Sequence, residues 1–252
     1  MSAREASDHG QATGVVKGQV AAHWNRRASH FDEEFGHSIS TSGERAAWER
    51  IFKLFLPSGR ALDVLDVGCG TGFLTFELVA RGHRVTGVDF AAAMLGEALR
   101  KATERNVSVR FQQADAEELP FTSRSFDLVI SRHLLWTLAD PEAAINEWTR
   151  IMRLGGRVVV VDGQFDPTSA PPASENARSS REYAEIADKL PFLHGRSREE
   201  IEGLLKRHGL MNVGSDPLLD LVAAQQQRMI EEGGEPRMRQ RYVVWGDVAR
   251  CD

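Results

Sequence analysis

The sequence has few cysteines and no long apolar run, and both shortages limit what kind of protein it encodes. Only two cysteines occur in 252 residues, Cys69 and Cys251, so neither a disulfide framework nor a thiolate zinc site is available. No segment approaches the roughly 18 consecutive apolar residues of a membrane-spanning helix. Residues 1–14 contain no apolar signal core. We therefore expect a cytoplasmic protein with reduced thiols and no membrane association.

The sequence also lacks an excess of basic charge and a recognisable metal motif. There are 31 Lys and Arg against 36 Asp and Glu, giving a net charge of -5, and the basic residues form no run. Such a chain has little electrostatic attraction to a phosphate backbone, so we do not expect nucleic acid as a partner. His23, His30 and His37 lie seven residues apart, without an i,i+4 pair or a carboxylate motif, so no metal site is expected.

What remains is an ordinary globular composition, 42% hydrophobic and 27% charged, which predicts a single folded core. Residues 1–17 show no apolar period and are interpreted as a flexible tail. Apolar residues then recur at helical spacing over 20–35 and 43–56. These two helices define a predicted N-terminal helical lid over 18–58.

Short apolar strands alternate with helices from residue 62 onward. The predicted strands are 62–67, 84–89, 107–112, 125–131 and 157–162, and the predicted helices include 72–80, 91–103 and one that begins at Asp140-Pro141. This alternation predicts an open, doubly wound α/β sheet, which binds ligands at the carboxyl ends of its strands.

The alternation breaks after residue 162. Residues 164–176 are rich in Pro, Ser and Ala, and 181–190 has helical spacing. Ser197 and Glu200 form a capping box that opens a further helix, and the last two strands are predicted over 213–222 and 241–249. We assign 59–252 to one α/β core that carries a cap insertion at about 164–195.

The most informative segment is the glycine-rich turn over 66–72. Alternate glycines allow the backbone to approach a ligand closely, and the following helix offers unpaired N–H donors. A dinucleotide-binding turn would require glycine at position 73, where this chain has Phe73, and a P-loop would require lysine followed by Ser or Thr. The sequence therefore disfavours both nicotinamide and nucleoside triphosphate binding.

The D-x-G-x-G-x-G pattern of this turn resembles the first motif of class I S-adenosylmethionine-dependent methyltransferases. Asp89 follows Gly68 by 21 residues, and segments 114–121, 126–131 and 150–158 resemble later motifs in the same order. The match is close over about 62–162. It implies a Rossmann-like, seven-stranded, mostly parallel sheet, with S-adenosylmethionine as cofactor and S-adenosylhomocysteine as product.

The resemblance also implies a set of cofactor contacts. They are Asp66, Gly68, Gly70, Gly72, Asp89, Phe90, Met94, Asp115, Ala116 and Ser131. The chemistry agrees, because Asp89 can accept hydrogen bonds from two ribose hydroxyls and Asp115 from an exocyclic amine. Simpler roles remain open: Asp89 at a helix N-terminus, Asp115 as a solvated loop acid, and Asp66 as an anchor for the backbone of the turn.

Methyl transfer from an activated sulfonium requires mainly orientation and desolvation, so few catalytic residues are expected. His133 follows the fourth strand and is the candidate general base. Arg132 beside it has the geometry to bind a substrate carboxylate. The alternatives are a structural histidine and a surface cation.

Residues 22–32 resemble the lid of small-molecule methyltransferases. The aromatic faces of Trp24 and Phe31 suit a sulfonium through cation–π attraction, although ordinary core packing explains them equally well. We assign Trp24, Phe31, Arg132 and Trp136 to the lid and substrate side of the site.

Absences after the fourth strand narrow the acceptor. The segment 131–134 is Ser-Arg-His-Leu, which lacks the Asn/Asp-Pro-Pro-aromatic motif of amino-methylating nucleic-acid enzymes. The glutamate pair of protein arginine enzymes and the metal-binding acids of catechol enzymes are also missing. We therefore predict methyl transfer to O, N, S or C of a small molecule. The alternatives are a quinone or lipid-precursor methyltransferase, suggested by 37–48, a non-catalytic S-adenosylmethionine-binding module, and the weakened nicotinamide oxidoreductase.

Overall fold

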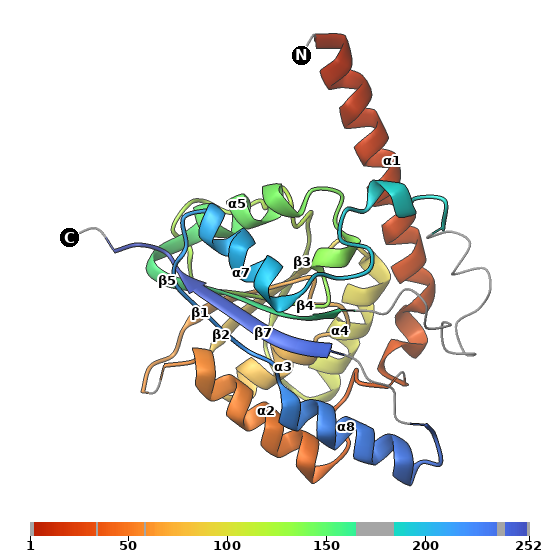
Figure 1. Cartoon of the computed structure of the whole chain (residues 1–252), viewed down its shortest axis with the longest axis vertical. Coiled ribbons are helices and arrows are strands. Elements are labelled where there is room, and N and C mark those ends of the chain that lie inside the picture. The colour runs from red at the N-terminus through yellow and green to blue at the C-terminus, as the bar shows by residue number, and fades with distance from the viewer. Residues whose placement is uncertain (1–2, 34, 58, 165–183, 236–239, 251–252) are drawn as a thin grey trace.

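A seven-stranded sheet forms the centre of the computed structural model, which describes residues 3–33, 35–57, 59–164, 184–235 and 240–250 (Figure 1). The strand order is β3-β2-β1-β4-β5-β7-β6, and only β7 runs antiparallel to its neighbours. The strands are β1 Asp63–Val67, β2 Arg84–Asp89, β3 Arg110–Gln113, β4 Phe126–Arg132, β5 Met152–Gln164, β6 Met211–Asp216 and β7 Gln240–Asp247. The predicted mostly parallel, doubly wound sheet is confirmed.

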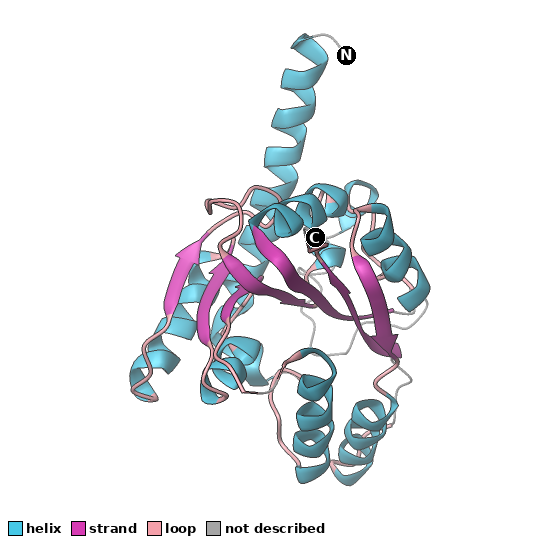
Figure 2. Cartoon of the chain, turned by 90° about the vertical axis from the view of Figure 1, so that its left-hand side faces the viewer, coloured by secondary structure: helices cyan, strands magenta, loops and turns pink. Residues whose placement is uncertain are grey.

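Helices cover both faces of this sheet (Figure 2). One face packs against α2 (Ser42–Phe55), α3 (Phe73–Ala80) and α8 (Leu219–Glu231), and the other against α5 (Pro141–Ile151) and α7 (Arg198–Arg207). Successive strand residues point to opposite faces of the sheet. Because consecutive residues of the central strands are apolar, both faces of the sheet are apolar. Val64, for example, packs in the apolar cluster on the face covered by α2, α3 and α8, and Leu65 packs in the cluster on the face covered by α5 and α7.

Two predicted helix starts are confirmed by their caps. The side chain of Asp140 accepts a hydrogen bond from the Ala143 backbone N–H at 2.9 Å, and Pro141 opens α5. Ser197 and Glu200 form both hydrogen bonds of the predicted capping box at the start of α7.

The strand order reverses between β1 and β4, which creates the switch point where open α/β sheets bind ligands. Val67 at the end of β1 lies opposite Ser131 near the end of β4. The glycine turn, Asp89 and Arg132 therefore share one edge of the sheet. None of the helices within the described residues is long and apolar enough to cross a bilayer.

The N-terminal segment differs from the expected loose tail. A single helix, α1, covers Ala3–Arg27 and is followed by the 3-10 helix η1 over Ala28–Glu33. The amino-terminal part of α1 extends beyond the domain in Figure 1, so it needs no apolar stripe, and periodicity alone could not reveal it. Where α1 reaches the domain, Val16 is 2% exposed and packs on Ile186 and Leu190.

The C-terminal prediction of a strand over 213–222 is partly wrong. β6 ends at Asp216, Pro217 interrupts the run, and α8 begins at Leu219. The apolar residues after Pro217 pack α8 against α2, a role that a short apolar run does not distinguish from a strand. Of the predicted cap, residues 165–183 lie outside the described residues. Of the helix expected over 181–190, the described part contains the 3-10 helix η3 over Ala187–Lys189.

α4 (Ala92–Glu104) contacts β2, β3 and α1. It therefore connects the sheet to the N-terminal helix, and its first turn lies beside the glycine turn described below.

Candidate cofactor and acceptor site

The glycine turn adopts a conformation that only glycine tolerates. Gly68 and Gly72 have φ values of +66° and +91°. A Cβ atom would lie 2.7 Å from Cδ1 of Leu134 at the first position and 2.7 Å from Cε2 of Phe76 at the second. Both the backbone angle and the lack of space exclude larger residues. The predicted close-approach turn is therefore present.

Asp89 connects the turn to the next strand. Its Oδ2 accepts a hydrogen bond from the Gly70 N–H, and its Oδ1 accepts one from the Ala91 N–H, both at 2.8 Å. Ala91 is the N-cap of α4, so the simpler helix-terminus role is also fulfilled. Each carboxylate oxygen has a second lone pair, which fits acceptance of two vicinal hydroxyls. Burial raises the pKa of this carboxyl group.

Asp66 lies in β1, directly before the glycine turn, and is bonded to the helix that follows the turn. It is 1% exposed, and its Oδ2 accepts a hydrogen bond from the Thr75 hydroxyl at 2.6 Å. The hydroxyl belongs to α3, so Asp66 anchors the helix that follows the turn. Burial raises the pKa of Asp66 to about 7, opposed by the hydrogen bonds from Thr75.

This raised pKa predicts a pH-dependent loss of stability. The Asp66 carboxyl has an ordinary pKa of 3.8 in the unfolded chain, so the folded state holds the proton more tightly. Its contribution is complete below that value and is lost as the pH rises through about 7. We expect urea denaturation between about pH 4 and pH 8 to show wild type losing stability relative to Asp66→Asn, which keeps an acceptor for Thr75. Parallel stability curves would contradict this assignment.

Asp115 is paired with a residue that sequence analysis missed. Lys17 of α1 places its Nζ 2.6 Å from Oδ2 of Asp115 and 2.6 Å from Oε2 of Glu117. Asp115 is therefore not a solvated loop acid. Ala116 beside it accepts a hydrogen bond from Nε1 of Trp148 at 3.1 Å. No local pattern connects Lys17 to a loop 98 residues away, so only the fold reveals this pair.

The remaining predicted cofactor residues occupy different environments. Phe90 is 39% exposed at the end of β2, whereas Met94 is 2% exposed and packs with Ala28 and Ala91 under the lid. Ser131 is 1% exposed, and its hydroxyl has no hydrogen-bond partner among the described residues. An unpaired buried hydroxyl at the sheet edge is the kind of group that a polar ligand satisfies.

The predicted lid lies over the turn. A Cβ atom on Gly70 would be 3.8 Å from Cε1 of Phe31, and the Trp24 ring is 5.8 Å from both the Phe31 and Trp136 rings. These predicted aromatic residues therefore form one edge-to-face cluster.

Polar contacts that the sequence did not reveal hold the lid in place. Asp32 accepts hydrogen bonds from the Thr71 hydroxyl and from Lys101 Nζ, both at 2.5 Å. Asn25 accepts one from the Ala93 N–H at 2.8 Å. The lid is thereby tied to the glycine turn and to both ends of α4.

The two acceptor-side candidates are not isolated surface groups. The Arg132 guanidinium donates to the Gly36 carbonyl and lies 4.2 Å from the Phe73 ring centroid. His133 contacts Arg241 through Nε2, and its Nδ1 lies 3.4 Å from Oδ1 of Asp162. Asp162 ends the strand segment predicted at 157–162, so the same edge rule could have found it. Within the described residues, no group of three or more His, Cys, Asp or Glu could hold a metal ion.

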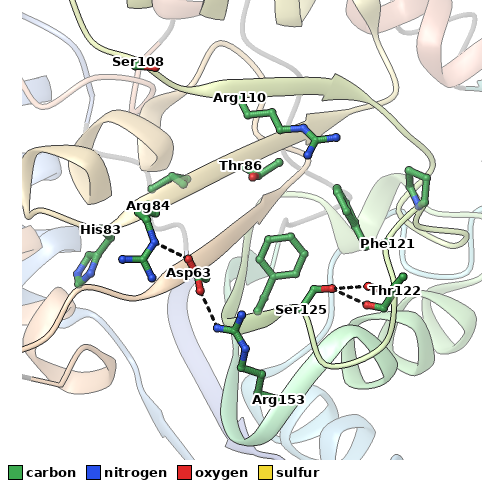
Figure 3. A pocket seen from close by; sticks show the side chains of 13 residues that line it. Asp63, His83, Arg84, Thr86, Ser108, Arg110, Phe121, Thr122, Ser125 and Arg153 are labelled. Carbon is green, nitrogen blue, oxygen red and sulfur yellow. Dashed lines mark hydrogen bonds and ion pairs between the residues drawn. The ribbon is translucent and has the colours of Figure 1, made fainter.

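A separate hollow lies at the opposite, amino-terminal edge of the sheet (Figure 3). It has a volume of about 690 Å³. Arg84 and Arg153 point to Asp63 from either side, with N–O distances of 2.6 and 2.7 Å. The aspartate therefore offsets their charge, and the hollow contains no part of the glycine turn.

Comparison with known proteins shows that part of this chain is similar to methyltransferases. A family model described as a methyltransferase domain matches residues 65–160. The chain is 41% identical over 134 residues to demethylmenaquinone methyltransferase of Thermus thermophilus, a match that covers 52% of this chain and 58% of that protein. The matched part of this chain thus spans less than two thirds of the relative.

Solved structures share the fold at low identity. The Haemonchus contortus phosphoethanolamine N-methyltransferase 2 in complex with S-adenosyl-L-methionine has a TM-score of 0.63 at 18% identity, covering 86% of this chain and 55% of that one. The geranyl diphosphate C-methyltransferase of Streptomyces coelicolor has a TM-score of 0.62 at 18% identity, covering 92% and 97%. The domain match over residues 65–160, the strand order and the glycine turn make this part of the chain similar to the class I S-adenosylmethionine-dependent methyltransferases.

Proposed function

We propose that this chain transfers the methyl group of S-adenosylmethionine to O, N, S or C of a small molecule at the carboxyl edge of the sheet. The observation that carries the proposal is the left-handed glycine turn whose Gly70 N–H donates to Asp89 at 2.8 Å. The turn brings backbone close to a ligand, and Asp89 retains lone pairs for the ribose hydroxyls.

The residues of the site divide the work between holding the cofactor and excluding water. Asp89 would hold the ribose, the 114–118 loop would hold the adenine side, and the Ser131 hydroxyl would face the cofactor from β4. The cofactor supplies an activated methyl group when bound. Trp24, Phe31 and Trp136 would cover the sulfonium side and keep water out during in-line displacement.

A quinone or lipid precursor is the second candidate acceptor. The 41% identity to a demethylmenaquinone methyltransferase supports it. The cytoplasmic location expected from the sequence stays a prediction, as does the general-base role of His133.

Ligand-dependent melting tests the cofactor assignment. Saturating S-adenosylhomocysteine should raise Tm by several degrees, because a ligand at about 100 times its Kd adds about 2.7 kcal/mol of stability. NAD at the same concentration should leave Tm unchanged. Stabilisation by NAD with no response to the adenosyl ligand would overturn the proposal.

Turnover separates an enzyme from a binding module that retains the nucleoside site. Purified protein should convert S-adenosylmethionine to S-adenosylhomocysteine when small-molecule acceptors are supplied, as measured by chromatography. Tight binding of both adenosyl compounds with no conversion across carboxylate, phosphate, amine, thiol and quinol acceptors would indicate the binding module.

A further inference from the structure

Two arginines and two supporting residues lie at the same edge of the sheet as the glycine turn. Arg132 and His133 come from the end of β4, Asp162 from β5 and Arg241 from β7, where Arg241 lies opposite Gly163 in the strand register. Asp162 is 3% exposed and Arg241 is 8% exposed. Charged groups are buried at such a cost only where each has a definite role or partner.

The hydrogen-bond roles of His133 follow from its neighbours. An arginine side chain only donates hydrogen bonds, so Nε2 of His133 must be the acceptor in its contact with Nη1 of Arg241. Nδ1 then carries the proton and faces Oδ1 of Asp162 at 3.4 Å. The same Oδ1 also accepts from the Gly163 N–H at 2.9 Å. These successive contacts, from Asp162 to His133 and from His133 to Arg241, thus fix the direction of the Arg241 guanidinium.

The second guanidinium, that of Arg132, lies near the first at Gly36. Arg132 donates to the Gly36 carbonyl. A Cβ atom on Gly36 would lie 3.4 Å from Nη2 of Arg241 and 3.5 Å from Nε2 of Gln225. Two guanidinium groups and a side-chain amide therefore converge around one glycine, whose φ is +86°.

This cluster brings two positively charged guanidinium groups together. Burial and the charge of Arg241 lower the pKa of Arg132 to about 9, so Arg132 is still charged at neutral pH. Arg241 is charged because a guanidinium group keeps its proton in proteins. Burial raises the pKa of Asp162 to about 7, which leaves that carboxyl only partly ionised there. An oxyanion between two guanidinium groups forms the strong, paired hydrogen bonds that each arginine fork provides.

The cluster also has the right place for the acceptor. Phe31 covers Gly70 of the turn, and its ring centroid is 3.9 Å from that of His37, the residue after Gly36. The side chains of Phe31 and His37 therefore connect the glycine turn to the chain at Gly36, where the guanidinium groups meet. An acceptor that extends from the glycine turn to Gly36 would present its reacting atom to the cofactor and its far end to the arginines.

We propose that Arg132 and Arg241 bind an oxyanion of the methyl acceptor, a carboxylate or a phosphate, and that His133 and Asp162 position Arg241 for it. The inference rests on the proposed methyl transfer at the glycine turn. It favours an acidic acceptor over a neutral quinone precursor, and it gives His133 a positioning role.

Calorimetric titration with three ring compounds tests the proposal on protein saturated with S-adenosylhomocysteine. Benzoate carries a carboxylate, phenyl phosphate carries a phosphate, and benzamide is the neutral isostere. We expect one of the anions to bind at least about tenfold more tightly than benzamide, and the preferred anion identifies the group. Arg132→Gln and Arg241→Gln should each remove that preference, whereas Arg153→Gln at the opposite edge should preserve it.

The positioning role has its own variant pair. His133→Gln retains an oxygen that can accept from Arg241 and should restore most of the anion preference that His133→Ala loses. Equal loss in both variants would reduce His133 to a structural residue and overturn its positioning role. Binding of benzamide as tight as both anions, or no anion binding at millimolar concentration, would overturn the oxyanion site.

A separate measurement keeps this result distinct from the proposed function. The affinity for S-adenosylhomocysteine is determined first for wild type and each variant, and it should be the same in all of them. If wild type does not bind S-adenosylhomocysteine, the methyltransferase proposal itself is refuted. Intact adenosyl binding without anion preference would refute only the oxyanion site.

Discussion

Replacing Asp89 with alanine should weaken S-adenosylhomocysteine binding by at least about a hundredfold. Hydrogen bonds to a charged acceptor contribute ~1.5–3 kcal/mol each, and two ribose hydroxyls would lose their acceptor together. The Gly70 N–H would also lose its 2.8 Å bond, so the turn itself would be less well fixed. Isothermal titration of the purified variant measures the change directly.

The fold should survive this replacement. The Asp89 carboxyl has its pKa raised by burial, so it is held at some cost, and the strand beneath it pairs along its length with β1 and β3. Circular dichroism should match wild type. Asp63→Ala is the matched control, because it removes a carboxylate from the amino end of the neighbouring strand, and it should leave cofactor affinity unchanged. Wild-type affinity in Asp89→Ala would exclude the ribose role.

Sequence analysis predicted the sheet edge well because its signals are local. The glycine pattern, the acid at the end of β2 and the residues after β4 each lie within one strand-and-turn unit, and the parallel topology brings such units together. The Gly70 N–H therefore donates to Asp89, and Ser131 lies opposite Val67 at the same edge of the sheet.

The missed contacts all join segments that are distant in sequence. Lys17 meets Asp115 across 98 residues, and Arg241 meets His133 across 108. A lysine on a polar helix or an arginine near the start of a strand carries no signal of its partner. The prediction of a strand over 213–222 was partly wrong for a different reason, because an apolar run of that length fits a strand and a helix equally well.

Tertiary contacts also bear on the role of a single residue, His133. The sequence supported His133 as a general base because a free imidazole titrates near neutral pH. In the structure, Nε2 accepts from Arg241, so that lone pair already has a donor. A place for His133 on the acceptor side stays a prediction, and its role there depends on Arg241 and Asp162.

The largest loss of stability should come from Trp148→Ala. Trp148 is 0% exposed in the cluster beneath α5, and replacing a buried aromatic residue by alanine costs about 3–5 kcal/mol. For a domain of this size each kcal/mol lowers Tm by about 2–4 °C, so a fall of roughly 6 °C or more is expected by calorimetry. A fall of less than about 2 °C would show that the cavity collapses without cost.

Trp148→Phe separates packing from the support that this side chain gives the cofactor loop. Phenylalanine fills most of the space but cannot donate to the Ala116 carbonyl, which accepts from Nε1 at 3.1 Å. We expect a smaller stability loss of about 1–3 kcal/mol together with weaker S-adenosylhomocysteine binding, because the 114–118 loop loses its buried anchor. Trp245→Phe on β7 is the matched control, since its indole packs against Gly214 and Tm should fall without a change in affinity. Equal affinities of Trp148→Phe and Trp245→Phe for S-adenosylhomocysteine would mean that the 114–118 loop keeps its shape without the hydrogen bond from the indole. The ion pair of Lys17 with Asp115 would then be sufficient to hold this loop.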